Sequence, residues 1–196
     1  MKITFIVLSI IVLFTSSCGN SSNNEDKSVA TTGELADVKV VKPSFVNTDA
    51  KLMAQVQHIY KVYLNMQAAL VSDKSTEAAT QAVITDQLIK GFDTTNLPAD
   101  QKEAYEAHVS KISALAINMS NTRDINVQRI SFSPLSDHVY QLVKTFGNDR
   151  PVYQTHCAMA FDGKGASWLS DKTEIRNPYY GSEMLECGEV INIVKK

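Results

Sequence analysis

Residues 49–70 read DAKLMAQVQHIYKVYLNMQAAL, and this stretch decides the fold class. Its large apolar residues recur at intervals of three and four positions, namely Leu52, Val56, Ile59, Tyr63, Met66 and Leu70. This spacing places them on one face of an α-helix, because a helical turn contains about 3.6 residues. The stretch therefore predicts an amphipathic helix that buries one stripe of side chains.

Further periodic stretches follow toward the C-terminus, through residues 79–88, 105–119 and 132–146. Gly91 is suited to end the second helix, and Pro98 is suited to begin the third. Pro134 either begins the fourth helix or kinks a longer one that starts near Asp124. Four amphipathic helices with short connections predict an antiparallel four-helix bundle over about residues 49–147.

The sequence changes character after Gly147, where glycine, aromatic and turn residues become frequent. We expect an irregular C-terminal segment with short β and turn structure, carrying a Cys/Met-rich motif over about residues 151–192. Residues 47–196 have the length of one domain, so the prediction is a single, mostly α-helical globular domain. The formal charge is −2 and no basic stripe is present, which argues against a nucleic-acid partner.

The C-terminal motif concentrates soft metal ligands. Cys157 and Met159 are two positions apart and share a face in an extended segment, while His156 faces the other way. Met184 and Cys187 are three apart and share a face on a helical turn. Thiolate and thioether ligands suit Cu(I), so these residues, together with His156, form a candidate site for that ion. No other cofactor is indicated.

A second interpretation stays open, in which Cys157 and Cys187 form a disulfide without any metal. An enzyme with Cys157 as nucleophile and His156 as base is disfavoured, because adjacent residues of an extended segment point apart. No residue is therefore assigned a catalytic role. Cations such as Lys164 or Arg176 are placed to lower the pKa of a thiol.

The remaining histidines and several aromatic residues have simpler interpretations. His58, His108 and His138 fall on the predicted helices, where we interpret them as surface or hydrogen-bonded residues. Aromatic side chains of the C-terminal segment are candidates to enclose a metal site, namely Phe161, Trp168, Tyr179 and Tyr180.

The N-terminus predicts export from the cytosol. An apolar run over residues 3–14 and the small residues before Cys18 indicate a signal peptide over residues 1–17. Cys18 would then be lipid-modified, because the segment resembles the lipobox of bacterial lipoproteins. Residues 18–46 are rich in polar residues and predict a flexible tether. The expected location is the cell envelope, with the domain facing the periplasm and attached to the membrane through the lipid on Cys18.

Several motifs carry a family resemblance. They are Cys157-Ala-Met-Ala-Phe161, Gly165-Ala-Ser-Trp-Leu-Ser170, Ile175-Arg-Asn-Pro-Tyr-Tyr-Gly181 and Met184-Leu-Glu-Cys-Gly-Glu-Val190, with Gln128-Arg129, Phe132 and Leu135-Ser136 in the last predicted helix. The chain resembles the family called domain of unknown function 3347, in which Ala158 is usually proline. That family occurs in envelope lipoproteins and as a domain of periplasmic adaptor subunits of copper and silver efflux pumps. The resemblance implies soft-metal handling and metal-efflux components as partners.

Overall fold

The computed structural model describes residues 38–196. The expected signal peptide, the lipidation of Cys18 and most of the expected tether lie outside the described residues.

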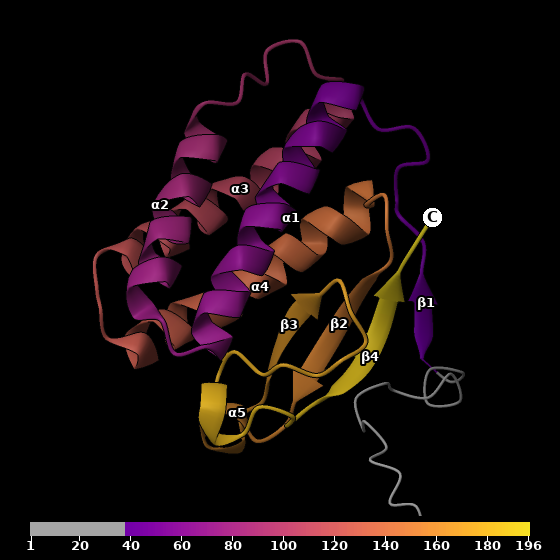
Figure 1. The fold of residues 1–196 in the computed structure, drawn as a ribbon. Coiled ribbons are helices and arrows are strands. Elements are labelled where there is room, and N and C mark those ends of the chain that lie inside the picture. The colour runs from indigo at the N-terminus through magenta and orange to yellow at the C-terminus, as the bar shows by residue number, and fades with distance from the viewer. Residues whose placement is uncertain (1–37) are drawn as a thin grey trace, which may run out of the picture.

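Long helices make up most of the described region, as Figure 1 shows, and the prediction of a mostly helical fold is confirmed. They are α1 (Ala50–Val71), α2 (Ser75–Lys90), α3 (Ala99–Ser120) and α4 (Ile125–Phe146). Pro134 lies inside α4, so this helix begins well before the proline. Its start is fixed by Asp124, whose carboxylate accepts a hydrogen bond from the backbone N–H of Asn126 at 2.9 Å.

Most of the regular β-structure follows the helices, where the sequence predicted an irregular segment with short β and turn structure, and one short strand precedes them. The strands are β1 (Lys39–Val41), β2 (Val152–Cys157), β3 (Ala166–Ser170) and β4 (Glu189–Val194), with the short helices α5 (Ala160–Gly163) and η1 (Gly181–Glu183) between them. They form one sheet in the order β1-β4-β2-β3. Strand β2 is antiparallel to β3 and β4, whereas β1 is parallel to β4.

Strand β1 corrects the boundary between the expected tether and the domain. Lys39–Val41 were assigned to the tether, but they pair with Asn192–Val194 of β4. Only three residues pair, and their partners lie at the other end of the chain. A local hydrophobic pattern cannot reveal such a contact, because the period of a strand needs more residues to become visible.

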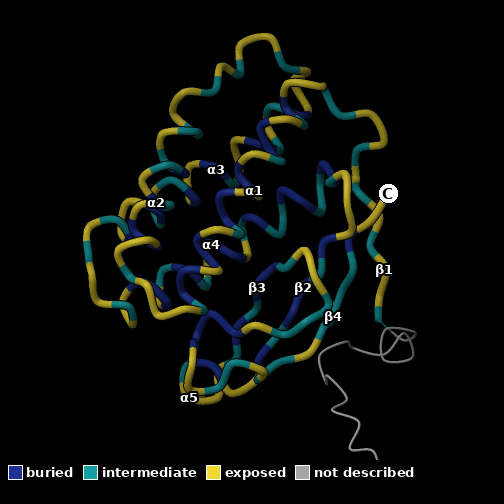
Figure 2. Tube along the Cα trace, in the orientation of Figure 1, coloured by how far each residue is buried: buried dark blue, intermediate teal, exposed yellow. Residues whose placement is uncertain are grey.

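The helices and the sheet share one hydrophobic core, which appears as the dark blue interior in Figure 2. Tyr63 of α1 lies at the junction and is 1% exposed. Its ring stacks on Phe132 with centroids 5.1 Å apart, and its hydroxyl accepts a hydrogen bond from the backbone N–H of Leu169 at 2.9 Å. The sheet is therefore attached to α1 and α4 through buried contacts.

Candidate functional site

The end of β2 presents the first cysteine. Cys157 is the last residue of β2 and is 1% exposed, whereas the preceding His156 is half-buried. The two side chains lie on opposite faces of the strand, and His156 Nδ1 lies 3.0 Å from Ser167 Oγ of β3. His156 therefore points away from the thiol of Cys157.

The second cysteine is placed by a loop that is organised around Asn177, a fully buried side chain. The Asn177 side chain donates a hydrogen bond to the carbonyl of Cys187 at 2.8 Å and accepts one from the N–H of Tyr179 at 2.8 Å. Its backbone N–H bonds the carbonyl of Leu185 at 2.8 Å. One buried amide thus closes the loop and holds the backbone of Cys187 in place.

Gly188 allows the chain to pass close to the sheet directly after Cys187. Its φ is +148°, and a Cβ atom at this position would lie 2.7 Å from the Trp168 ring and 3.0 Å from the carbonyl oxygen of His156. A larger residue would push the chain away from β2. The glycine therefore brings Cys187 against the end of that strand.

The two thiols meet although they are 30 residues apart in the sequence: Cys157 Sγ lies 2.7 Å from Cys187 Sγ. Both are free cysteines in the structure. A disulfide has an S–S length of about 2.05 Å. Two thiolates that bind one ion at about 2.3 Å in a tetrahedral site are about 3.8 Å apart. The observed separation lies between these values, so small side-chain rotations lead to either state.

The thioethers are less closely associated with the thiols. Strand β2 ends at Cys157, and Met159 has helical backbone angles and is 55% exposed, so the alternation expected for an extended segment does not apply to it. Met184 is half-buried, and its carbonyl accepts a hydrogen bond from the N–H of Cys187 at 3.2 Å. Within residues 38–196, neither thioether sulfur makes a hydrogen bond with either thiol.

The surroundings of the thiols keep Cys187 protonated. Its pKa is raised to about 11 by the hydrogen bond with Cys157, by burial and by the charge of Cys157. The prediction that a cation such as Lys164 or Arg176 lowers the pKa of a thiol is therefore wrong for Cys187. Arg176 is occupied by Glu174, with the Arg176 Nε to Glu174 Oε1 distance at 2.9 Å. The thiolate that binds a metal has to be formed by displacing a proton.

Tyr180 links the two segments of the chain that carry the cysteines. The Tyr180 hydroxyl donates a hydrogen bond to the carbonyl of Met159 at 2.6 Å, which bridges the two segments that carry the cysteines. Burial raises the pKa of Tyr180, and the charges of Cys157 and Cys187 raise it further. Beneath it, the Tyr179 ring contacts Trp168 at 5.9 Å between centroids.

An ion pair between a buried arginine and an exposed aspartate anchors the cysteine-bearing loop to the helices. Arg129 of α4 is 7% exposed and donates to the carbonyl of Pro178 at 2.8 Å and to that of Leu70 at 3.1 Å. It also contacts Asp73 Oδ1 at 2.6 Å, and Asp73 accepts a hydrogen bond from the Ser182 hydroxyl at 2.7 Å. Sequence reasoning missed this anchor, although Gln128-Arg129 was among the motifs of the family resemblance.

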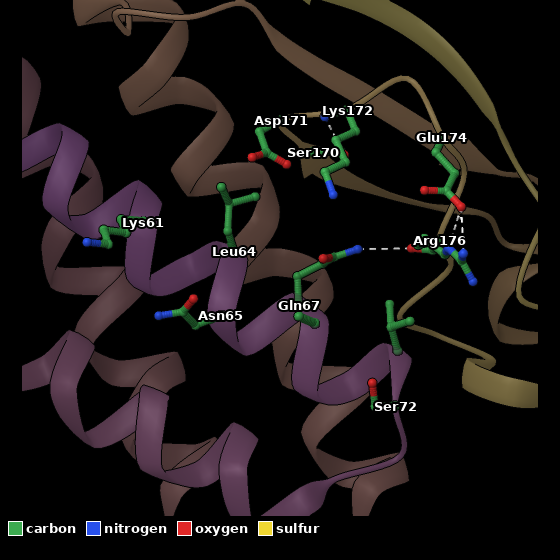
Figure 3. Close-up of a pocket in the computed structure, with 12 residues that line it drawn as sticks. Lys61, Leu64, Asn65, Gln67, Ser72, Ser170, Asp171, Lys172, Glu174 and Arg176 are labelled. Atoms are coloured by element: carbon green, nitrogen blue, oxygen red, sulfur yellow. Dashed lines mark hydrogen bonds and ion pairs between the residues drawn. The ribbon is translucent and has the colours of Figure 1, made fainter. Parts of the chain in front are cut away.

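A separate groove of about 580 Å³ lies between α1 and the loop after β3, as drawn in Figure 3. Its charged lining residues have both signs: Lys61, Lys172 and Arg176 are positive, and Asp171 and Glu174 are negative. Gln67 crosses its floor and donates a hydrogen bond to the carbonyl of Arg176 at 2.9 Å. None of the sulfur-bearing residues lines this groove, so it is distinct from the thiol pair.

The composition of the described region limits the kind of metal site that the thiol pair can form. Residues 38–196 hold no group of three or more histidine, cysteine, aspartate or glutamate side chains that could bind a metal ion. A site at the thiol pair therefore has to be completed by thioethers or by ligands from outside these residues. Among the helices of the same residues, none has the length and apolarity needed to cross a membrane.

Fold and site together define a class: a mostly helical domain whose C-terminal sheet region brings two distant thiols into contact. The family model described as "Protein of unknown function (DUF3347)" matches residues 59–151. This match confirms the resemblance to the family, and it covers the helices from within α1 to the end of α4. It ends before Cys157, so the thiol pair lies beyond the matched residues. No curated protein and no solved structure matches the chain.

Proposed function

We propose that the protein is a cell-envelope lipoprotein that binds a soft transition-metal ion, Cu(I), through reduced Cys157 and Cys187. The observation that supports this proposal is the 2.7 Å contact between the two sulfur atoms, which come from separate segments. Thiolates are the ligands that Cu(I) prefers, and the burial of Cys157, which is 1% exposed, limits access of water.

Met184 and Met159 complete the ligand set in this proposal. Met184 lies three residues before Cys187, is half-buried and is hydrogen-bonded to it through the backbone, so it serves as the third ligand. Met159 is 55% exposed and suits a role in capturing the ion from solvent or passing it on. His156 takes no part, because its ring is engaged with Ser167 on the other face of β2.

The wider role is sequestration of the ion in the periplasm or its delivery to metal-efflux components. The lipid on Cys18 holds the protein at the membrane, and residues 18–37 act as the tether. The four long helices form an antiparallel bundle that serves as the scaffold for the sheet region. We assign the protein no catalytic activity and no nucleic-acid partner.

A titration of the full chain with Cu(I) tests the proposal. The protein carries Cys18→Ser, is held reduced in detergent without oxygen, and competes with a Cu(I) chelator. We expect one ion per chain, and we expect Cys157→Ser and Cys187→Ser each to weaken binding by orders of magnitude. Met53→Leu, in α1, is the matched control and should leave the affinity unchanged. Absence of copper uptake by the reduced protein would falsify the proposal.

A disulfide between Cys157 and Cys187 is the second candidate, and the same sulfur contact favours it, since 2.7 Å is closer to a disulfide than to a shared tetrahedral ion. Its formation removes two protons and two electrons, which an external disulfide of the thioredoxin class accepts as two thiols. The protein would then act through contacts with other proteins. Counting free thiols before and after reduction in the Cys18→Ser protein distinguishes the candidates: a permanent disulfide exposes thiols only after reduction and takes up no copper.

A further inference from the structure

The helical region contains a pair of histidines that no part of the thiol site uses. His108 of α3 and His138 of α4 face each other, and their Nδ1 atoms lie 3.2 Å apart. The rings are tilted by 42° with centroids 5.4 Å apart. Both side chains are half-buried, so they are accessible at the seam between the two helices. Sequence reasoning interpreted each of them singly, as a surface or hydrogen-bonded residue on a predicted helix.

The distance between the two nitrogens fits a shared metal ion. Imidazole nitrogens bind ions such as Zn(II) at about 2.0–2.1 Å, so two of them in one coordination shell lie about 2.9–3.4 Å apart. The observed 3.2 Å is within this range. Helices α3 and α4 already hold the nitrogens at the required spacing, so an ion binds with little rearrangement of the backbone.

The protonation state of the pair is also suitable. Burial lowers the pKa of His108, and His138 and Lys111 lower it further. Burial lowers the pKa of His138 as well, with Lys111 adding to the effect and Asp137 opposing it. Both imidazoles are therefore neutral at pH 7, which is the form that binds metal. In the hydrogen-bonded pair one Nδ1 carries a proton, and metal binding requires that proton to move to Nε2 of the same ring.

We propose that His108 and His138 form a second metal site, which binds a divalent ion of the borderline class, such as Zn(II) or Cu(II), through their Nδ1 atoms. Among residues 38–196 no third histidine, cysteine or carboxylate completes the cluster. Water or a ligand from outside fills the remaining positions, so the ion exchanges readily. This site differs from the thiol pair in its ligands and in the ions it selects.

Calorimetric titration with Zn(II) tests this site independently of the thiols. The full chain carries Cys18→Ser, Cys157→Ser and Cys187→Ser, so that no thiol competes. We expect one Zn(II) per chain, and we expect His108→Gln and His138→Gln each to weaken binding at least about tenfold, because each removes a ligand. His58→Gln, at an exposed lone histidine of α1, is the matched control. Zinc binding that survives in both variants, or that falls equally in the control, overturns the proposal.

A spectroscopic measurement on the same protein with both histidines intact covers the case in which a variant fails to fold. Long-range ¹H–¹⁵N spectra should show the Nδ1 resonances of two histidines shifting together on addition of Zn(II), with Nε2 protonated. Shifts at His58 or His156, or at Nε2 instead of Nδ1, contradict the assignment. Copper(I) uptake by the reduced thiols does not depend on these histidines, so the two proposals fail or stand separately.

Discussion

The helical region and the C-terminal region are stabilised by different kinds of contact. In α1 to α4, apolar side chains repeat along each helix, and many of them contribute to one core. In the C-terminal region, single polar or small residues decide where the chain goes, as Asn177 and Gly188 do around Cys187. A region held by many similar contacts keeps its structure when one residue is changed, whereas a region held by a few specific contacts does not. The thiol pair depends on the second kind.

The largest expected effect tests whether the two regions unfold together. Phe132→Ala removes a fully buried ring that lies between Tyr63 and Tyr179, and we expect a loss of about 3–5 kcal/mol in unfolding free energy. Urea unfolding is followed by circular dichroism for the helices and by fluorescence of Trp168, the single tryptophan of the chain.

Both signals should shift to the same urea concentration in the Phe132→Ala protein. Ile130→Ala on the same helix is the control, because Ile130 is 60% exposed and its truncation should change stability by about 0.5 kcal/mol or less. If only the tryptophan signal shifts, the C-terminal region is an independent unit and the shared core does not couple it to the helices.

Reduction of the thiol pair has the next largest expected effect if the protein is isolated with Cys157 and Cys187 joined. A disulfide across these 30 positions stabilises the fold by about 3–4 kcal/mol in the chain-entropy model. The urea midpoint of the Cys18→Ser protein should therefore fall on adding a reductant. A variant that also carries Cys157→Ala and Cys187→Ala should not respond. An unchanged midpoint in the first protein rules out the disulfide at rest.

Sequence periodicity predicted the helical region well, because helical contacts are local. Leu52, Met66 and Leu142 were placed on apolar faces and are fully buried. The sheet could not be predicted in this way, since β1 and β4 pair across most of the chain. Only the three-dimensional fold determines such a register.

The candidate site, like the fold, could be predicted from the sequence only in part. The residue types were visible in the sequence, and so was the opposite orientation of His156 and Cys157. The exposure of Met159 was not, because it depends on β2 ending at Cys157. The link between Arg129 and the loop also required the structure, since its partners lie in α1, in the turn after α1 and in the loop.

Gly188→Ala tests how strongly the thiol contact depends on close packing, with an expected loss of about 1–3 kcal/mol. The added methyl group would lie 2.7 Å from Trp168, at a φ of +148° that L-residues rarely adopt. Gly163→Ala is the matched control, because its φ is +82° but nothing lies within 4 Å of the added atom. Thermal melting should therefore show a larger loss for Gly188→Ala. Equal losses would mean that only backbone strain matters at both positions.

The smallest expected effect concerns the ion pair that anchors the loop. Hydrogen bonds from Ser182 and the neighbouring Arg129 hold the pKa of Asp73 below its usual value despite some opposing desolvation. A carboxylate with a lowered folded-state pKa stabilises the fold fully above its unfolded pKa of about 4, and this contribution is lost as the pH falls through the folded value. The Asp73 side chain is 40% exposed, so we expect Asp73→Asn to cost only about 0.2–1 kcal/mol at pH 7. Urea midpoints at pH 7 and pH 3 should show the difference between wild type and Asp73→Asn shrinking at the lower pH.

Glu77→Gln is the control, because it breaks an exposed ion pair between Glu77 of α2 and Lys74 and changes the charge equally without touching the loop. Only Asp73→Asn should therefore also alter Trp168 fluorescence.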